Sequence, residues 1–363
     1  MNAIFNFIIW NASPEIFSLG KLSLRWYGLL FATGFLIGQQ ILIRIYKNEG
    51  KSEKHVETLT IYMLLSTVIG ARLGHCLFYQ PDYFLAHPLE ILYVWEGGLA
   101  SHGATIGILF AIYLYSKKQT DQSYLYVLDR LVITIALAGC LIRTGNLMNS
   151  EIYGKQTDNS IGFVFAHGLE SDILNNYPTI IENVNIENLH SDTLIAGRKY
   201  AQLELEVEPS NKNISKESLN SFVENELSDH LHYSQNTDIK ENVLVLEGSL
   251  NYKNTDKNTA KIKLLGVPRH PSQIYEAGLC LLLFIFLYLI YKKYKSKTPE
   301  GRIFGLFVFI LFGFRFLVEF LKAPQVDFEN NMNLNMGQLL SIPLILVGLF
   351  ITIKSFSKKQ EIV

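Results

Sequence analysis

The stretch LYVLDRLVITIALAGCLIRTGN, residues 125–146, is almost entirely apolar over a length that suits a lipid bilayer. An α-helix needs about 20 such residues to cross the hydrocarbon core. Six other stretches have comparable length and composition, so we predict seven transmembrane helices. The predicted spans are 24–46, 56–79, 98–116, 125–146, 272–291, 303–321 and 336–354.

The predicted spans fall into two groups, separated by a polar segment. Hydrophobic residues make up 49% of the 363-residue chain, but the mean hydropathy is only +0.18, because the polar and acidic segment offsets the apolar regions. We therefore predict three parts: residues 1–154 with the first four helices, an inserted domain of residues 155–268, and residues 269–363 with the last three helices.

The polar segment has its own secondary-structure signals. KYAQLELEVEP (199–209) and NVLVLEGSLNY (242–252) alternate apolar and polar residues, as half-buried strands do. SKESLNSFVENEL (215–227) has helical spacing instead, with Ser215 in the N-cap position. The predicted fold is thus an all-α polytopic membrane protein that carries a small inserted α+β domain.

Loop charges predict the orientation. Lysines follow the first, third, fifth and seventh spans, whereas segment 80–97 has no Lys or Arg and segment 322–335 has only Lys322. Because basic loops stay in the cytoplasm, we expect the N-terminus and residues 155–268 outside and the C-terminus inside. Asp129 and Arg130 should then mark the cytoplasmic interface.

Composition and motifs argue against several classes of protein. The net charge is −1, so no basic field points to nucleic acid. The three cysteines, Cys76, Cys140 and Cys280, form no CxxC motif, which argues against a disulfide framework or a zinc site. The N-terminus lacks a basic n-region and a clear cleavage site, so we interpret it as mature protein rather than a signal peptide. No Walker loop, HExxH or GxSxG motif occurs.

Arg143 and Asn146 lie one helical turn apart at the outward end of the fourth span, and Glu151 follows closely. A charge deep in a span is costly and needs a partner or water. No acid in the same helix lies within one turn of Arg143, and a guanidinium suits bidentate binding of phosphate. We therefore expect Arg143 to bind a phospholipid phosphate.

Other polar residues also occur near the outward ends of the spans. Arg315 and Glu319 are spaced i, i+4 in the sixth span. This spacing suits either a structural ion pair that locks helices together or a working site. The further candidates at outward positions are Tyr27, Arg72, His75, His102, His270, Gln273, Tyr275 and Glu276.

Some charged and small residues have purely structural interpretations. Arg25 and Arg302, near span ends, suit side chains that reach the head groups. Glu276, in a first helical turn, suits the helix dipole. Gly70 and Gly74 form a small-xxx-small pair that favours close helix contact.

The stretch RTGNLMNSEIYG, residues 143–154, resembles the G-R-x-G-N-F-x-N-x-E pattern of the bacterial phosphatidylglycerol–prolipoprotein diacylglyceryl transferases. Ile142 and Leu147 replace the usual Gly and Phe, and segment 155–268 is longer than that pattern leads us to expect. Further blocks agree in order, over roughly two thirds of the chain: RWYGLLFATGF (25–35), GARLGHCLFY (70–79), GGLASHGATIG (97–107), RHPSQIYEAG (269–278), FRFLVEFLKAPQ (314–325) and NMGQLLSIP (335–343).

The resemblance implies a membrane-embedded transferase. Its expected reaction moves the sn-1,2-diacylglyceryl group of phosphatidylglycerol to the lipobox cysteine of a prolipoprotein and releases glycerol 1-phosphate. The expected location is the bacterial inner membrane, and no metal or soluble cofactor is required.

The reaction needs a thiolate nucleophile and stabilisation of the departing phosphate. We expect Arg143 to bind the phosphate with Asn146, Arg315 to act as a second clamp oriented by Glu319, and His102 to act as the base. The other predicted lipid-binding residues are Tyr27, Arg72, Glu151, His270 and Gln273.

Two other classes of protein remain open at this point. A secondary transporter would also hide Arg and Glu in spans, but it usually shows inverted repeats, and the sequence shows no repeat. A non-catalytic phospholipid-binding protein could also use Arg143 for phosphate. Thioether formation with phosphatidylglycerol and a lipobox peptide separates both from a transferase.

Overall fold

The computed structural model describes residues 7–19, 22–94, 97–211, 213–234, 236–244, 259–322 and 332–357. It divides the chain into two compact units, each built from three segments. The first unit comprises Met1–Leu30, Arg143–Glu276 and Leu317–Asn335, and the second comprises Phe31–Ile142, Ala277–Phe316 and Met336–Val363.

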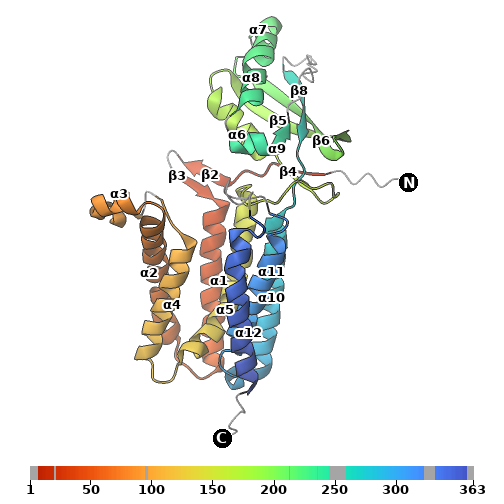
Figure 1. The fold of residues 1–363 in the computed structure, drawn as a ribbon. Coiled ribbons are helices and arrows are strands. Elements are labelled where there is room, and N and C mark those ends of the chain that lie inside the picture. Colours follow the sequence, from red (N-terminus) through yellow and green to blue (C-terminus); the bar gives the residue numbers. More distant parts are fainter. Residues whose placement is uncertain are drawn as a thin grey trace. The chain divides into compact units, whose positions relative to one another are not determined.

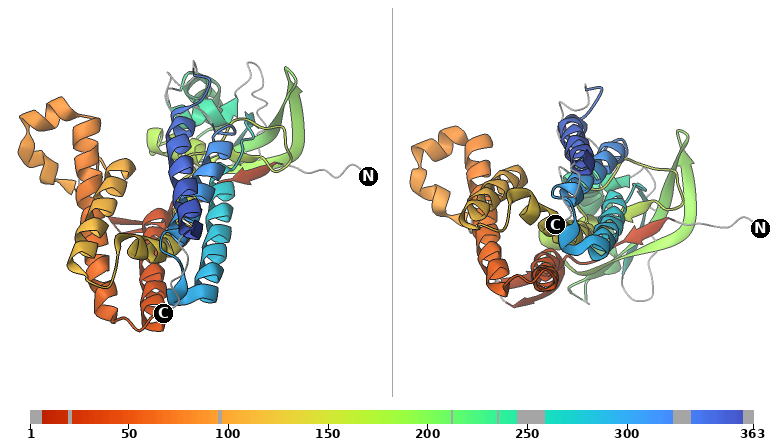
Figure 2. Two further views of the ribbon diagram at one scale, coloured as in Figure 1. Left: turned by 60° about the horizontal axis from the view of Figure 1, so that its bottom comes forward. Right: turned by 90° about the horizontal axis from the view of Figure 1, so that it is seen from below.

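The second unit is built from long apolar helices that lie side by side with roughly aligned axes (Figures 1 and 2). Four of these helices have a few residues at one end that are assigned to the first unit. The bounds are α1 (Trp26–Asn48), α2 (Glu53–Phe78), α4 (Ser101–Lys118), α5 (Tyr124–Met148), α10 (Ser272–Tyr294), α11 (Arg302–Val318) and α12 (Met336–Ser357), with short turns α3 (Pro81–Ala86), η1 (Pro88–Leu92) and η4 (Lys295–Lys297).

Five of these helices, α1, α2, α5, α10 and α12, are long and apolar enough to cross a membrane, among the described residues. The chain is therefore a multi-pass membrane protein, as predicted. The predicted third and sixth spans also form helices, but α4 has 18 residues and α11 only 17, and neither is among the five.

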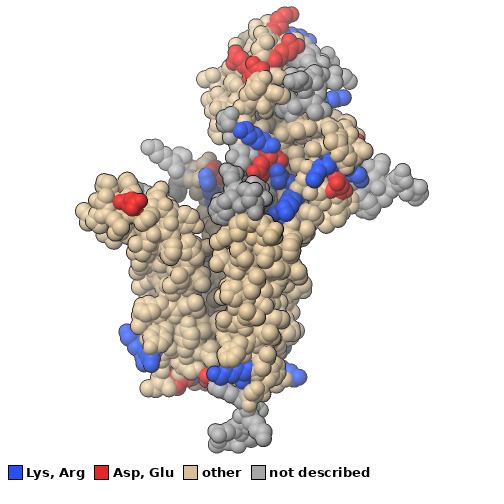
Figure 3. Space-filling model, viewed as in Figure 1, with Lys and Arg blue, Asp and Glu red and all other residues tan. Residues whose placement is uncertain are grey.

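The outer surface of the second unit suits lipid. Large apolar side chains such as Leu36, Ile61 and Phe350 are more than half exposed, which in water would be unfavourable. On the face drawn in Figure 3, the sides of these helices are free of charge, and charged side chains gather at the lower end. The last turns of α4 and α10 are basic there, with Lys117, Lys118, Lys292 and Lys293.

Glycines bring α2 and α4 into close contact. A Cβ at Gly70 would lie 2.5 Å from the carbonyl oxygen of Gly103, and one at Gly74 would lie 2.7 Å from the Cα of Gly103. The prediction that Gly70 and Gly74 permit close helix contact is confirmed, and Gly103 is the partner on α4.

Gly103→Ala is expected to destabilise the protein, because a Cβ there would lie 2.3 Å from the carbonyl oxygen of Gly70. Overpacking of this kind costs about 1–3 kcal/mol. Gly313→Ala is the matched control, since nothing lies within 4 Å of a Cβ at Gly313 in α11. Thermal unfolding in detergent should show a lower Tm for the first variant only, and equal Tm values would contradict the contact.

The first unit contains a four-stranded antiparallel sheet in the order β5–β6–β8–β7. The strands are β5 (Ile181–Ile195), β6 (Arg198–Pro209), β7 (Val243–Leu244) and β8 (Ala260–Gly266). The surrounding helices are α6 (His167–Asn176), α7 (Lys216–Ser221), η3 (Phe222–Leu227), α8 (Ser228–Tyr233) and α9 (Thr237–Asn242).

Predictions for the polar segment can be compared with these elements. The strand predicted at 199–209 is β6, and the helical stretch at 215–227 is α7 with η3. Ser215 is its N-cap, since its hydroxyl oxygen accepts from the backbone N–H of Ser218 at 3.1 Å. The strand predicted at 242–252 is observed only at β7, and residues 245–252 lie outside the described residues.

Three short segments near the N-terminus also form strands, so the description all-α needs correction outside the inserted segment as well. β1 (Ile8–Trp10) pairs in parallel with β4 (Phe163–Phe165), and β2 (Glu15–Leu19) pairs antiparallel with β3 (Leu22–Arg25). The first long helix begins at Trp26, two residues after the predicted start at 24, because the preceding residues belong to β3.

Candidate functional site

The signature stretch 143–154 ends α5 and continues into a tight turn with unusual backbone angles. Ser150 has φ of 54° and Ile152 has φ of 61°, and left-handed φ is rare for a β-branched residue such as isoleucine. Strained conformations of this kind cost about 1–3 kcal/mol and persist only where neighbours enforce them. The turn therefore has to be held by the surrounding structure.

The first turn of α10 holds this backbone. Ser272 Oγ donates to the carbonyl of Ile152 at 2.6 Å, and Gln273 Nε2 donates to the carbonyl of Glu151 at 2.6 Å. Both donors are almost fully buried. Gln273, predicted to bind lipid, is thus placed against the main chain of the signature turn.

Gly154 joins three chain segments that are distant in sequence. Its N–H donates to the carbonyl of His270 at 2.8 Å, and the N–H of Lys155 donates to the carbonyl of Leu321 at 2.7 Å. A Cβ on Gly154 would lie 2.6 Å from the Leu321 oxygen. Only glycine fits this junction, which brings Lys322 beside the signature stretch.

A chain of buried ion pairs crosses the junction. Glu276 Oε2 pairs with Arg143 Nε, and Glu276 Oε1 lies 2.6 Å from Lys322 Nζ. Lys322 Nζ also lies 3.2 Å from Glu319 Oε1, and Asn335 Nδ2 donates to Glu319 Oε2 at 3.1 Å. Glu276, Lys322 and Glu319 are each less than a tenth exposed. Lys322 is therefore shared by two carboxylates.

Arg143 also begins a second set of contacts. Its Nη1 donates to Asn146 Oδ1 at 3.4 Å, and Asn146 Nδ2 donates to Glu151 Oε1 at 2.7 Å. Asn149 Nδ2 donates to the same Glu151 oxygen at 3.3 Å. The structure thus brings together three predicted site residues: Arg143, Asn146 and Glu151.

Lys322 is a functional candidate that the sequence did not reveal, and Glu276 is one whose role the sequence left open. Glu276 was interpreted as a residue that answers the helix dipole, and Lys322 as a single loop charge. The structure instead shows Glu276 as the counter-ion of Arg143. No acid within the same helix neutralises Arg143, but an acid from α10 does. The signal available in the sequence was a glutamate in the first turn of a span, which by itself is ambiguous.

Tyr27 and His270 also belong to the first unit. Tyr27 packs on Gly145 of α5, where a Cβ would lie 2.9 Å from Tyr27 Cδ2. His270 Nδ1 lies 3.2 Å from the hydroxyl of Tyr275, and burial lowers the pKa of His270, which favours its neutral form.

The second unit contains the other predicted site residues. Arg72 is 4% exposed, and its guanidinium donates to the carbonyls of Glu90, Ile91 and Gly97 at 2.6, 3.0 and 2.6 Å. These bonds tie down the loop after α2. His102 is exposed in the first turn of α4, with its ring edge-on to Phe78 at 5.0 Å. Arg315 lies in the last turn of α11.

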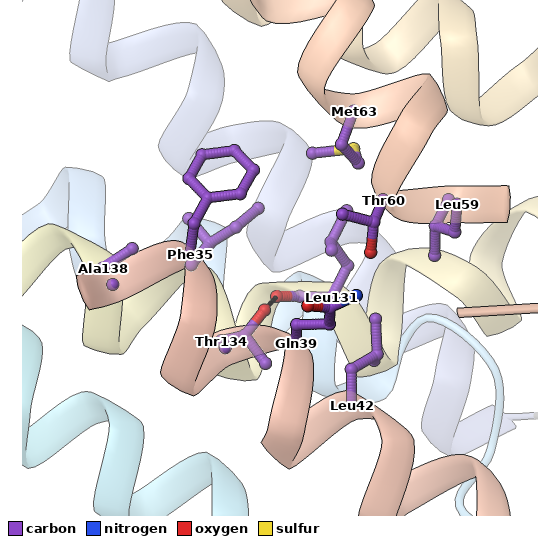
Figure 4. Close-up of a pocket in the computed structure, with 12 residues that line it drawn as sticks. Phe35, Gln39, Leu42, Leu59, Thr60, Met63, Leu131, Thr134 and Ala138 are labelled. Atoms are coloured by element: carbon purple, nitrogen blue, oxygen red, sulfur yellow. Dashed lines mark hydrogen bonds between the residues drawn. The ribbon is translucent and has the colours of Figure 1, made fainter. Parts of the chain in front are cut away.

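A small cavity of about 90 Å³ lies between α1, α2 and α5 in the second unit. Its walls are mostly apolar, as Figure 4 shows, with Phe35, Leu42, Leu59, Met63, Leu131 and Ala138 among the lining residues. The hydroxyl of Thr134 in this cavity donates to the carbonyl of Leu131 at 2.8 Å, so its proton is already used. The cavity suits a hydrocarbon group. Within the described ranges, no cluster of three or more His, Cys, Asp or Glu residues could hold a metal ion.

Comparison with known proteins places these features in one family. The family model described as prolipoprotein diacylglyceryl transferase matches residues 14–354. Relatives named phosphatidylglycerol–prolipoprotein diacylglyceryl transferase occur in several bacteria. The relative from Tolumonas auensis is 34% identical over 98% of this chain and 100% of its own length. That from Chloroherpeton thalassium is 34% identical over 98% and 97%, and that from Bacteroides fragilis is 32% identical over 100% of both chains.

The extent of these matches also bears on segment 155–268. Because the matches cover nearly all of both chains, these relatives have room for a segment of similar length. The length of the segment is therefore not a departure from these proteins.

Proposed function

Since this chain belongs to the prolipoprotein diacylglyceryl transferase family, we propose that it transfers the sn-1,2-diacylglyceryl group of phosphatidylglycerol to the cysteine thiol of a prolipoprotein lipobox. The observation that carries the proposal is the family's signature stretch, built around a partly buried arginine that pairs with Glu276 in a membrane protein. The reaction forms a thioether and releases glycerol 1-phosphate, and it is the first step of lipoprotein maturation.

The chemistry explains why an arginine is needed. The thiolate attacks the sn-3 carbon of the diacylglyceryl group, the C–O bond to phosphate breaks, and its electron pair stays on the phosphate oxygen. The phosphate thereby gains one negative charge, which a preorganised cation stabilises in the transition state. Arg143 and Asn146 are the proposed donors to this charge.

Glu276 is proposed to be the counter-ion of Arg143 when no lipid phosphate is bound. An unpaired guanidinium away from water is costly. Glu276 spans Arg143 and Lys322, so it can release Arg143 to the phosphate and keep Lys322 as its partner. After this exchange Arg143 would pair with the phosphate and Glu276 with Lys322, so no charged side chain would be left without a partner.

Other predicted roles remain proposals. His102 is the proposed base that accepts the thiol proton, because a neutral imidazole near pH 7 suits that task. Arg315 is the proposed second phosphate clamp. Glu319 accepts hydrogen bonds from Lys322 and Asn335. It is proposed to fix the orientation of the positively charged side chains near it. The apolar cavity between α1, α2 and α5 is proposed to take part of an acyl chain.

We also propose that α4 and α11 cross the membrane, giving seven spans with the N-terminus and residues 155–268 outside. Both helices are apolar and connect loops of alternating charge, as the positive-inside rule requires. In the bacterial inner membrane, the proposed location, this orientation places the C-terminus in the cytoplasm.

The orientation gives a direct prediction for cysteine labelling. With the native thiols removed, single cysteines at Ser123 and Ser296 should be protected from an impermeant thiol reagent in intact cells, and one at Ser210 should be labelled. All three should react after permeabilisation, which controls for accessibility. Labelling at Ser296 but not at Ser210 would invert the proposed topology.

The function itself is tested with purified protein, phosphatidylglycerol and a lipobox peptide. Mass spectrometry should find the peptide heavier by one diacylglyceryl group, and a peptide with serine in place of the cysteine should stay unmodified. Lipid binding without thioether formation would favour a non-catalytic lipid-binding protein. Solute flux into proteoliposomes without thioether formation would favour a transporter.

A further inference from the structure

A polar cavity of about 440 Å³ lies within the first unit, next to the signature turn. Ligand sites for small molecules typically measure about 300–1,000 Å³. Strands β2 and β3, the turn at Asn149 and Ser150, and helix α6 contribute residues to its wall. The lining residues are Ser13, Pro14, Glu15, Arg25, Asn149, Ser150, Phe165, His167, Gly168, Ser171, Asn175 and Asn242.

We propose that this cavity binds a glycerol phosphate group, a role that rests on the proposed function and extends it to the polar product. The lining combines a cationic side chain, Arg25, with hydroxyl and amide groups. A guanidinium suits phosphate, and hydroxyl and amide groups suit the hydroxyls of glycerol. A mostly polar wall of this composition favours a polar ligand.

Two buried polar atoms at the turn support a ligand. Asn149 Oδ1 and Ser150 Oγ are buried and have no hydrogen-bond partner within the described part of the chain. Leaving such groups unpaired is unfavourable, because each has lost its hydrogen bonds to water. Both residues line the cavity, where hydroxyl groups of a ligand could satisfy them.

The cavity is also connected to the proposed phosphate site. Asn149 donates through Nδ2 to Glu151, and the same Glu151 oxygen accepts from Asn146, which contacts Arg143. The hydrogen-bonded chain thus runs from Arg143, the proposed phosphate ligand, to the cavity wall. A polar leaving group released at Arg143 would find its next polar contacts there.

Arg25 has a competing partner, and the geometry allows exchange. Arg25 Nη2 lies 3.3 Å from Glu15 Oε1, with both side chains substantially exposed. Exposed ion pairs of this kind contribute little to stability. A phosphate can therefore replace Glu15 as the partner of Arg25 at little cost in free energy.

The experiment measures binding of sn-glycerol 1-phosphate to the full-length protein in detergent by calorimetry, without phosphatidylglycerol. Asn175→Asp adds a negative charge at the cavity and should raise the Kd about tenfold or more. Asn176→Asp is the matched control, because the neighbouring Asn176 is exposed on the same helix but does not line the cavity. Arg25→Gln should also weaken binding about tenfold, whereas Arg198→Gln, an exposed arginine elsewhere in the unit, should not.

Two arms distinguish the source of the group. If the released product occupies the cavity, Asn175→Asp should weaken inhibition of transfer by glycerol 1-phosphate but leave the KM for phosphatidylglycerol in nanodiscs unchanged. If the head group of the intact lipid occupies it, that KM should rise as well. Either outcome for the KM would support a glycerol phosphate site in this cavity.

Absence of glycerol 1-phosphate binding to the unmodified protein, or equal binding by Asn175→Asp and Asn176→Asp, would overturn the inference. These outcomes are independent of transfer. A protein that forms the thioether but does not bind glycerol 1-phosphate would lose only this site, and one that binds it but forms no thioether would lose the proposed function.

Discussion

Replacing Arg143 by alanine is expected to lower the rate of diacylglyceryl transfer by about 10²–10³-fold or more, the usual cost of losing one preorganised donor to developing charge. Arg143 lies at the end of α5 with Asn146 beside it, so both can reach one phosphate. Asn146 is buried and Arg143 is partly buried, which strengthens each electrostatic contact relative to bulk water. Arg143→Lys should also lose most of the rate, because a point charge cannot replace the planar fork of donors.

Single-turnover transfer to a lipobox peptide in defined phosphatidylglycerol measures the effect. Asn146→Ala should fall somewhat less than Arg143→Ala. His102→Gln should also fall less, because a cysteine thiol is partly ionised without help. Arg198→Ala controls for the loss of an arginine in the same unit, and Tm values show whether each variant is folded. Near-normal turnover by Arg143→Ala, together with an inactive His102→Gln, would instead make base catalysis the main contribution.

Lys322→Met is expected to cause the largest loss of stability. Lys322 is 4% exposed and pairs with both Glu276 and Glu319. Removing one partner of a buried ion pair costs about 3–5 kcal/mol, because the remaining charge is left uncompensated. Transfer should fall too, since Glu276 would have no other cation to hold when it releases Arg143.

Thermal and denaturant unfolding in detergent should show a clearly lower Tm for Lys322→Met. Lys155→Met is the matched control: Lys155 belongs to the same junction, but it is exposed, and among the described residues its ammonium donates to the carbonyl of Phe320 rather than to a carboxylate. Adding Glu319→Gln to Lys322→Met should restore part of the stability, because one uncompensated carboxylate is removed. Equal Tm values for Lys322→Met and Lys155→Met would show that the buried pairing contributes nothing.

The membrane-spanning helices could be predicted closely from the sequence. The span predicted at 336–354 is helix Met336–Ser357, and that at 125–146 is Tyr124–Met148. The predicted start of a helix was less accurate where the preceding loop has an unusual backbone conformation. The helix of the predicted third span, α4, begins at Ser101 rather than at residue 98. The preceding Gly97 and Gly98 have φ of 88° and 66°. These are not helical values, so the helix does not extend back to them.

The partners of the interior charges in the second unit could not be predicted. Asp129 and Arg130 were predicted to mark the cytoplasmic interface, and the structure adds that both side chains are fully buried. Asp129 accepts from the backbone N–H groups of Gly301 and Phe304 at the start of α11, and Arg130 pairs with Glu49 at 3.0 Å. A charge near a span end suits either solvent or a distant partner, and local sequence does not distinguish the two.

The sequence by itself determined that this is a multi-pass membrane protein with a polar inserted segment and a signature built around Arg143 and Asn146. Hydropathy adds up along consecutive residues, and a bilayer responds to that local sum. Only the tertiary structure decided that Glu276 and Lys322 complete the site. A buried charge signals that it needs a partner, but the identity of the partner depends on which distant segments the fold brings within a few ångströms, here at the junction around Gly154.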